Sequence, residues 1–346
     1  GGFTSVCCMA NTDPAADNPA VIEYMVAKAK AEAAVNIFPV AAVTRGLRGE
    51  ELAEMGRCFR EGAIAFSDDG HPIVRSEVMR RALEYAKQFD VPVISHCEDS
   101  GLSSGGLVNE SLLSTEIGLP GIPSLAEEIM VARDIMLAKE FGRIHIAHIS
   151  SAGSVKLVRL AKKEKVPITC ETCPHYFTLT EEATRTYDTN TKVNPPLRSL
   201  ADVKEIIKGL KDGTIEVIAT DHAPHTIEEK KVEFGLAASG MVGLETALGL
   251  VITELIEKKI LTWKQAAQKL SANPARILKL SNKGTIKPGA DADIIVVDPR
   301  MEWVVDPSKF ASKSKNTPFA GWKLKGKVLY TIVGGKVVVE DGRLLC

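Results

Sequence analysis

The sequence alternates short apolar runs with longer amphipathic runs, and this alternation constrains its fold more than any other feature. The apolar runs predict strands at 3–9, 36–42, 63–67, 91–96, 143–149, 166–171 and 215–220. Helical patterns fall between them, at about 20–34, 49–60, 75–89, 124–141, 152–164 and 200–212. Strands rich in Val and Ile that alternate with helices are typical of parallel sheets covered by helices. The chain is therefore predicted to be an α/β protein.

The number of predicted strands favours an incomplete barrel. A TIM-type (β/α)8 barrel has eight parallel strands, and seven are visible here. The chain starts with Gly1-Gly2, without a Met, directly before the apolar run at 3–9. We therefore expect a TIM (β/α)8 barrel that lacks its first strand in this chain, with N-terminal residues of the protein absent.

A different pattern follows residue 240. Helices are expected at 241–258, 262–271 and 274–280, and a turn-rich stretch begins at Gly284. Strands are predicted at 294–298, 326–333 and 336–340, and Gly334-Gly335 is a two-residue hairpin signal between the last two. We predict a hydrolase-sized barrel at 1–283 and a small β subdomain at 284–346 that packs on it.

Composition excludes several classes of protein. The 346 residues are enough for a sizeable core, and a formal net charge of −1 gives no electrostatic case for binding nucleic acid or an anionic membrane surface. No apolar run reaches the roughly 20 residues that a membrane span needs. The seven cysteines are scattered, which favours a reducing, cytoplasmic location. Cys170 and Cys173 form a lone CxxC, which we interpret as ordinary strand and loop residues because structural zinc needs a second pair.

Metal-ligand residue types recur where the predicted strands end. Barrel enzymes carry their chemistry at these C-terminal ends. The residues concerned are Asp68, Asp69, His96, His148, His175, Asp221 and His225. Imidazole and carboxylate together suit zinc or a similar divalent ion, which makes hydroxide available near neutral pH. The pattern predicts a metal site, with His175 left open between a supporting and a structural role.

Strand geometry helps to choose among these residues. His145 and His148 face opposite sides of their strand, and His148 lies at its C-terminal end, so we select His148. Asp68 and Asp69 are adjacent and point apart, so one can reach a metal while the other caps the turn before a glycine. Asp221 ends an apolar strand, where a buried anion requires a cation or hydrogen-bond donors.

Several motifs carry a resemblance to a known family. They are Phe66-Ser67-Asp68-Asp69-Gly70, His96-Cys97-Glu98-Asp99, Asn194-Pro195-Pro196-Leu197-Arg198 and Asp221-His222-Ala223-Pro224-His225. With them the chain resembles the amidohydrolase superfamily, most closely the type I dihydroorotases, over essentially its whole length. The resemblance implies reversible hydrolysis of dihydroorotate to N-carbamoyl-L-aspartate in de novo pyrimidine (UMP) biosynthesis, by a hydroxide formed at zinc.

The resemblance also implies roles for individual residues. His96 and His148 would ligate the second zinc, Asp69 would bridge two zinc ions, and Asp221 would ligate the first and act as general base and acid. Asn11 and His225 would hold the substrate carboxylate. Asn194 and the backbone around Ser239 and Gly240 would contact the ring. We also expect a homo-oligomer and association with aspartate carbamoyltransferase.

One family motif is missing from the sequence. The family opens with His-x-His-x-Arg on its first strand, whose histidines bind the first zinc, and this chain contains no such motif. Either the chain is truncated, or it is a non-catalytic relative that assembles with aspartate carbamoyltransferase. In both cases we expect one or two zinc ions, weak binding of the first, and little activity from this chain alone.

A related alternative is a hydantoinase, dihydropyrimidinase or allantoinase. The resemblance implies that those enzymes bridge their metals with a carboxylated Lys. The run 63–69 contains no Lys, so Asp69 favours the dihydroorotases. The charged and then small-residue segment 226–240 is interpreted as a loop over the site, with a solvated surface loop as the alternative.

Overall fold

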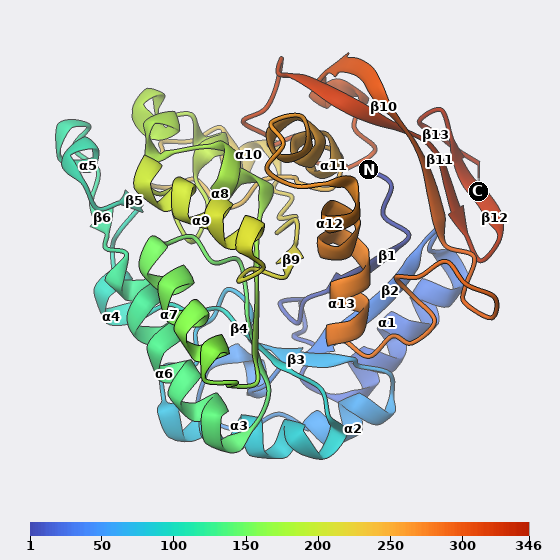
Figure 1. Cartoon of the computed structure of the whole chain (residues 1–346). Coiled ribbons are helices and arrows are strands. Elements are labelled where there is room, and N and C mark those ends of the chain that lie inside the picture. The colour runs from blue at the N-terminus through green and yellow to red at the C-terminus, as the bar shows by residue number, and fades with distance from the viewer. Residues whose placement is uncertain (346) are drawn as a thin grey trace.

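The computed structural model describes residues 1–345 and has a curved parallel sheet at its centre (Figure 1). The sheet has seven strands in the order β1-β2-β3-β4-β7-β8-β9. Their bounds are Ser5–Cys8, Asn36–Ala41, Ala65–Ser67, Val93–Ser95, Ile144–Ile146, Ile168–Thr172 and Val217–Ile218. All seven predicted strands are confirmed. The sheet is an incomplete TIM-type barrel, as the pattern of the sequence predicts.

Helices cover the outer face of the sheet (Figure 1). They are α1 (Pro19–Glu32), α2 (Met55–Arg60), α3 (Ser76–Ala86), α6 (Leu125–Phe141), α7 (Ala152–Lys163) and α9 (Leu200–Asp212). In α3 the apolar residues Val78, Met79, Ala82, Leu83 and Ala86 are buried, which is the stripe that helical periodicity places toward a core. The helix predicted at 49–60 begins only at Met55, because a β-bridge between Thr44 and Leu52 occupies the preceding residues.

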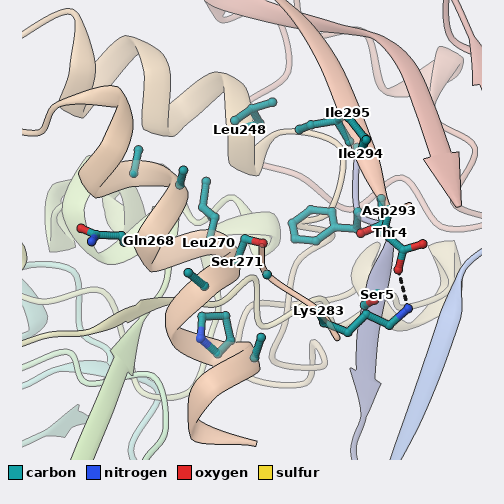
Figure 2. Close-up of a pocket in the computed structure, with 18 of the residues that line it drawn as sticks. Thr4, Ser5, Leu248, Gln268, Leu270, Ser271, Lys283, Asp293, Ile294 and Ile295 are labelled. Carbon is teal, nitrogen blue, oxygen red and sulfur yellow. Dashed lines mark hydrogen bonds and ion pairs between the residues drawn. The ribbon is translucent and has the colours of Figure 1, made fainter. Parts of the chain in front are cut away.

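Strands β1 and β9 are the two edges of the sheet. Within residues 1–345, β1 pairs only with β2, and β9 pairs only with β8. A mainly apolar cavity of about 730 Å³ lies beside β1, lined also by residues 263–275 and by the start of the C-terminal sheet (Figure 2). Lys283 and Asp293 form an ion pair of 2.5 Å at its edge. The candidate metal residues do not line this cavity.

The C-terminal part consists of short helical segments and a second sheet. Residues 247–256 form α11 (Ala247–Leu250) and the π-helical η5 (Val251–Ile256), so the helix predicted at 241–258 starts six residues late. Next come α12 (Trp263–Ala267), η6 (Gln268–Ala272) and α13 (Asn273–Ile277). The helix predicted at 274–280 therefore ends at Ile277.

The second sheet is antiparallel and lies beside the N-terminus (Figure 1). Its strands are β10 (Ile294–Val304), β11 (Lys323–Val333), β12 (Lys336–Glu340) and β13 (Arg343–Leu344). The predicted hairpin is confirmed: Gly334 and Gly335 have φ of 55° and 81°, a conformation that glycine adopts without steric cost. Strand β13 was not predicted, and the domain boundary at 283/284 stays a prediction.

Several short elements extend the loops at the C-terminal ends of the strands. They are α4 (Ser100–Ser103), β5 (Val108–Asn109), α5 (Leu112–Glu116), β6 (Gly121–Ile122), α8 (Pro174–Thr178) and α10 (Ile227–Lys230). The sequence patterns do not predict them. Within the described residues, none of the helices combines the length and the apolar character required to cross a membrane.

Candidate metal centre

Three adjacent strands bring Asp69, His96 and His148 together. In the sheet, Phe66 of β3 lies beside Val93 of β4, and Val93 lies beside Ile144 of β7. The residues that follow these strands therefore meet at one edge of the sheet. His96 Nδ1 is 2.9 Å from His148 Nε2, and His148 Nε2 is 3.3 Å from Asp69 Oδ1. One ligand atom from each residue lies within 4.8 Å of the others.

This geometry fits a divalent metal. Two imidazole nitrogens and one carboxylate oxygen are ligands that zinc accepts, and three protein ligands leave a position open for water or substrate. His96 Nε2 lies 2.7 Å from Glu98 Oε2, so its proton is directed to that carboxylate and Nδ1 is left as the ligand atom. The sequence therefore builds a metal-binding group of two histidines and one aspartate.

Glu98 is a functional residue to which the sequence analysis gave no role. Besides His96, it accepts a hydrogen bond of 2.7 Å from Asn194 Nδ2. Burial raises the pKa of Glu98, but the hydrogen bond and charge of His96 outweigh this and bring the pKa to about 2. The signal was present in the sequence, because residues 96 and 98 are two apart and so face the same side of an extended chain.

The three ligand residues are strongly coupled electrostatically. Burial lowers the pKa of His148, but the carboxylate of Asp69, with smaller effects from Asp221 and Glu171, raises it to about 9. Burial likewise raises the pKa of Asp69, and the hydrogen bond and charge of His148 then bring it below its usual value. The empty cluster thus holds an imidazolium–carboxylate pair, and a metal replaces the proton between them.

The neighbouring candidates have other partners. Asp68 accepts hydrogen bonds from the backbone N–H groups of Val43 (2.7 Å) and Thr44 (3.1 Å) and from the Thr44 hydroxyl. Its side chain anchors the segment after β2 and does not cap the turn before Gly70, so that interpretation was wrong. His145 contacts Thr169 and Glu171 on β8 at 2.8 and 3.0 Å, away from the metal group.

His175, on α8 after β8, is almost completely buried, with 2% of its surface exposed. Burial, with a smaller contribution from His148, lowers its pKa to about 3, so the ring is neutral. Its Nε2 makes no hydrogen bond within the described residues. His175 therefore packs beside the site without joining the group of three ligands.

Asp221 follows β9 and lies near the group of three without belonging to it. Burial raises its pKa to about 6, and the positive field of His148 opposes this. Its φ is 47°, and that of His148 is 32°. Non-glycine residues in this left-handed region cost on the order of 1–2 kcal/mol, and such residues cluster at functional sites.

The predicted substrate residues fall into separate groups. His225 Nε2 lies 2.9 Å from the carbonyl oxygen of Ser239, so these two residues and Gly240 are brought together. Gly240 has a φ of 141°, and a Cβ there would lie 2.6 Å from the Cβ of Ala223. Asn194 is linked to His96 through Glu98, whereas Asn11 is exposed in the loop after β1.

A buried arginine connects the loops around the site. Arg198, with 2% of its surface exposed, donates hydrogen bonds to Ser150 Oγ (3.1 Å), Asn109 Oδ1 (2.9 Å) and the Ile122 carbonyl (2.8 Å). Ser150 follows His148 by two residues. The Arg of the Asn-Pro-Pro-Leu-Arg motif thus connects the Asn194 segment to the β7 end and to the β5–β6 extension.

Comparison with known proteins agrees with this site. The amidohydrolase family model matches residues 1–338. The dihydroorotase of Pelotomaculum thermopropionicum is 59% identical over 342 residues, which are 99% of this chain and 80% of that protein. The dihydroorotase of Acetivibrio thermocellus is 56% identical over 347 residues, 100% of this chain and 81% of that protein.

Solved structures share the fold. The L-hydantoinase of Arthrobacter aurescens superposes with a TM-score of 0.90 at 24% identity, over 100% of this chain and 79% of that one. At this identity the likeness concerns the fold alone, whereas the sequence relatives above are dihydroorotases across nearly the whole chain. The chain therefore belongs to the amidohydrolase family and, within it, to the dihydroorotases.

Proposed function

We propose that the chain carries the site for reversible hydrolysis of the ring amide of dihydroorotate to N-carbamoyl-L-aspartate. The observation that carries the proposal is the convergence of Asp69, His96 and His148 in a chain that belongs to the dihydroorotases. A divalent metal, which we propose to be zinc, would supply activated water near neutral pH and polarise the amide carbonyl.

In this proposal the protein residues hold the metal and move the proton. His96 and His148 supply ligand nitrogens, Asp69 supplies a carboxylate oxygen, and Glu98 keeps His96 in the tautomer that leaves Nδ1 available. Asp221 would take the proton of the attacking water and pass it to the departing ring nitrogen. Its place at the end of β9, beside the ligand group, supports this role, and we also propose it as a ligand of a first metal.

The substrate is proposed to be oriented by the β9 side of the site. His225 and Asn11 would bind the carboxylate, while Asn194 and the backbone of Ser239 and Gly240 would contact the ring. Fixing the substrate in this way supplies the proximity contribution to catalysis. We further propose a cytoplasmic homo-oligomer, with aspartate carbamoyltransferase as a partner.

The test is the binding of three cyclic amides to the zinc-loaded chain, followed by calorimetry. We expect dihydroorotate to bind and hydantoin and allantoin, which lack its carboxylate, to bind at least about tenfold more weakly, because a buried charge pair is lost. His225→Ala should remove most of this preference. Equal binding of the uncharged rings would contradict the proposed substrate.

Turnover is measured in the same preparations. Because the sequence lacks the His-x-His-x-Arg motif, we propose that this chain alone hydrolyses dihydroorotate slowly and binds one zinc tightly. Zinc content after dialysis gives the stoichiometry. Rapid hydrolysis by this chain would show that Asp69, His96, His148 and Asp221 are enough for catalysis and would refute that part of the proposal.

A further inference from the structure

Two lysines are buried beside the proposed substrate residues. Lys192 precedes Asn194 by two positions, and Lys230 ends the short helix α10. Their exposed fractions are 7% and 5%, respectively. Lysine is rarely buried to this extent, because an ammonium group withdrawn from water needs compensating partners. Neither lysine forms an ion pair with a carboxylate within the described residues.

The partners of both ammonium groups are backbone carbonyls of one segment, residues 231–240, which we name the β9 loop. Lys192 Nζ donates to the carbonyls of Phe234 (2.9 Å) and Gly235 (3.0 Å). Lys230 Nζ donates to the carbonyls of Ala238 (2.8 Å) and Gly240 (3.1 Å). Four carbonyl groups of the β9 loop thus converge on two buried cations.

The same lysines connect the β9 loop to its surroundings through their backbone. The N–H of Gly240 donates to the carbonyl of Lys192 at 2.8 Å, and the hydroxyl of Thr189 donates to the carbonyl of Lys230 at 2.5 Å. Asn316 also donates to the Gly240 carbonyl, at 3.1 Å. The loop that carries Ser239 and Gly240 is therefore fixed to the segment that carries Asn194.

We propose that Lys192 and Lys230 are positioning residues that hold the β9 loop closed, so that Ser239, Gly240 and the adjoining His225 stand in register with Asn194. The part of this inference that concerns substrate rests on the proposed function. Neither lysine touches substrate or metal in this arrangement. Each acts through the backbone carbonyls that its ammonium group binds.

Surface polarity and simple packing are the competing explanations for the two lysines. Burial and mutual repulsion lower the pKa of Lys230 to about 8, and only Asp188 opposes this with a negative charge. A site that needed only apolar packing would not retain two cations at this cost. The four carbonyl contacts point instead to a requirement for hydrogen-bond donors at fixed positions.

The test is amide hydrogen exchange of the whole chain, followed by mass spectrometry, for Lys192→Met and Lys230→Met. Methionine keeps an unbranched apolar stem of similar length and removes the donors. We expect exchange in residues 232–240 to speed up at least about tenfold, while peptides covering β3, β4 and β7 keep their protection. Lys231→Met is the matched control, because Lys231 is adjacent and exposed.

A chemical rescue separates donation from packing. Lys230→Ala leaves space for n-propylammonium, which replaces the missing methylenes and the ammonium group, whereas n-butane-like neutral filling is provided by n-propanol at the same concentration. We expect the amine to restore slow exchange in residues 232–240 and the alcohol to restore much less. Equal rescue by both compounds would overturn the proposal in favour of packing.

Ligand binding gives the second readout. In both lysine-to-methionine variants the affinity for dihydroorotate should fall about tenfold, while zinc affinity stays within about twofold. Unchanged exchange in both variants, or loss of protection throughout the chain in both, would overturn the positioning role. Faster loop exchange in a chain whose wild-type form does not bind dihydroorotate would keep the positioning role and remove the proposed substrate.

Discussion

Asp69, His96 and His148 stand on three neighbouring strands, whereas Asp221, His225 and Gly240 belong to the edge strand β9 and the segment after it. The first group is positioned by the register of a parallel sheet and by direct contacts between side chains. The second is positioned by backbone hydrogen bonds to buried lysines and Asn316. The metal half of the site is therefore built into the sheet, and the substrate half is built by its loops.

The difference has a consequence for how the two halves respond to change. In the metal half, removal of a ligand leaves its neighbours fixed by the sheet, so the damage should stay local and affect metal affinity. In the substrate half, the backbone itself is the contact surface, so a change in one residue should move several binding groups. Substitutions can therefore separate metal binding from substrate binding.

The largest effect is expected from removing a ligand of the metal half. His148→Asn should lower zinc affinity by more than about hundredfold, beyond the 10–100-fold typical of residues that only support a ligand. Competition with a chromophoric chelator measures it. His145→Asn is the control from the same strand, because His145 hydrogen-bonds to Thr169 and Glu171 instead. Similar losses in the two variants would remove His148 from the metal group.

A smaller loss of zinc affinity should follow from Glu98→Gln. The amide can still accept a hydrogen bond but no longer carries the charge that pairs with His96 and Asn194 at 2.7 Å each. We expect zinc affinity to fall by about 10–100-fold. Glu77→Gln, on the exposed part of α3, is the control. Full zinc affinity in Glu98→Gln would mean that His96 keeps its tautomer without this partner.

Gly240→Ala tests the substrate half by itself. The new Cβ would lie 2.6 Å from the Cβ of Ala223 and 3.0 Å from His225 Nε2, at a φ that disfavours alanine. We expect about a tenfold weaker affinity for dihydroorotate in calorimetry, with zinc affinity unchanged. Gly235→Ala is the matched control, since its Cβ would meet no atom closer than 3.6 Å. A parallel loss of zinc affinity would show that the two halves are not independent.

The sequence predicts the metal half far better than the substrate half. Buried parallel strands appear as continuous apolar runs, so all seven were recognised, and Asp69, His96 and His148 follow those runs directly. The geometry of strand ends then implies that they meet. The choice between His145 and His148 also followed from strand parity, and the structure places His145 away from the metal group.

The substrate half depends on contacts that local patterns do not encode. Glu98 and Asn194 are 96 residues apart, and no periodicity relates them. Lys230 lies in the charged run Glu228-Glu229-Lys230-Lys231, which is typical of a solvated surface, yet its side chain is buried. Short elements such as β5 and β6 are too brief to leave a periodic signal.

The smallest effect concerns His175, which follows β8, the strand between the two halves. Burial lowers its pKa in the folded chain to about 3, whereas an unfolded histidine titrates near 6.5. The unfolded chain therefore binds an extra proton between these values, and the free energy of unfolding falls as the pH drops below about 6.5. Full stability from this residue is present above that pH.

His175→Gln removes this titration. Between pH 6 and pH 5 the wild-type chain should lose about 1 kcal/mol more unfolding free energy than the variant. Urea unfolding in the presence of a chelator measures it, because bound metal would add the titration of His148. His71→Gln serves as control, since His71 is an exposed loop residue. Identical pH dependence in wild type and His175→Gln would mean that water reaches the ring, so the strand between the two halves would not separate them by a dry, uncharged layer.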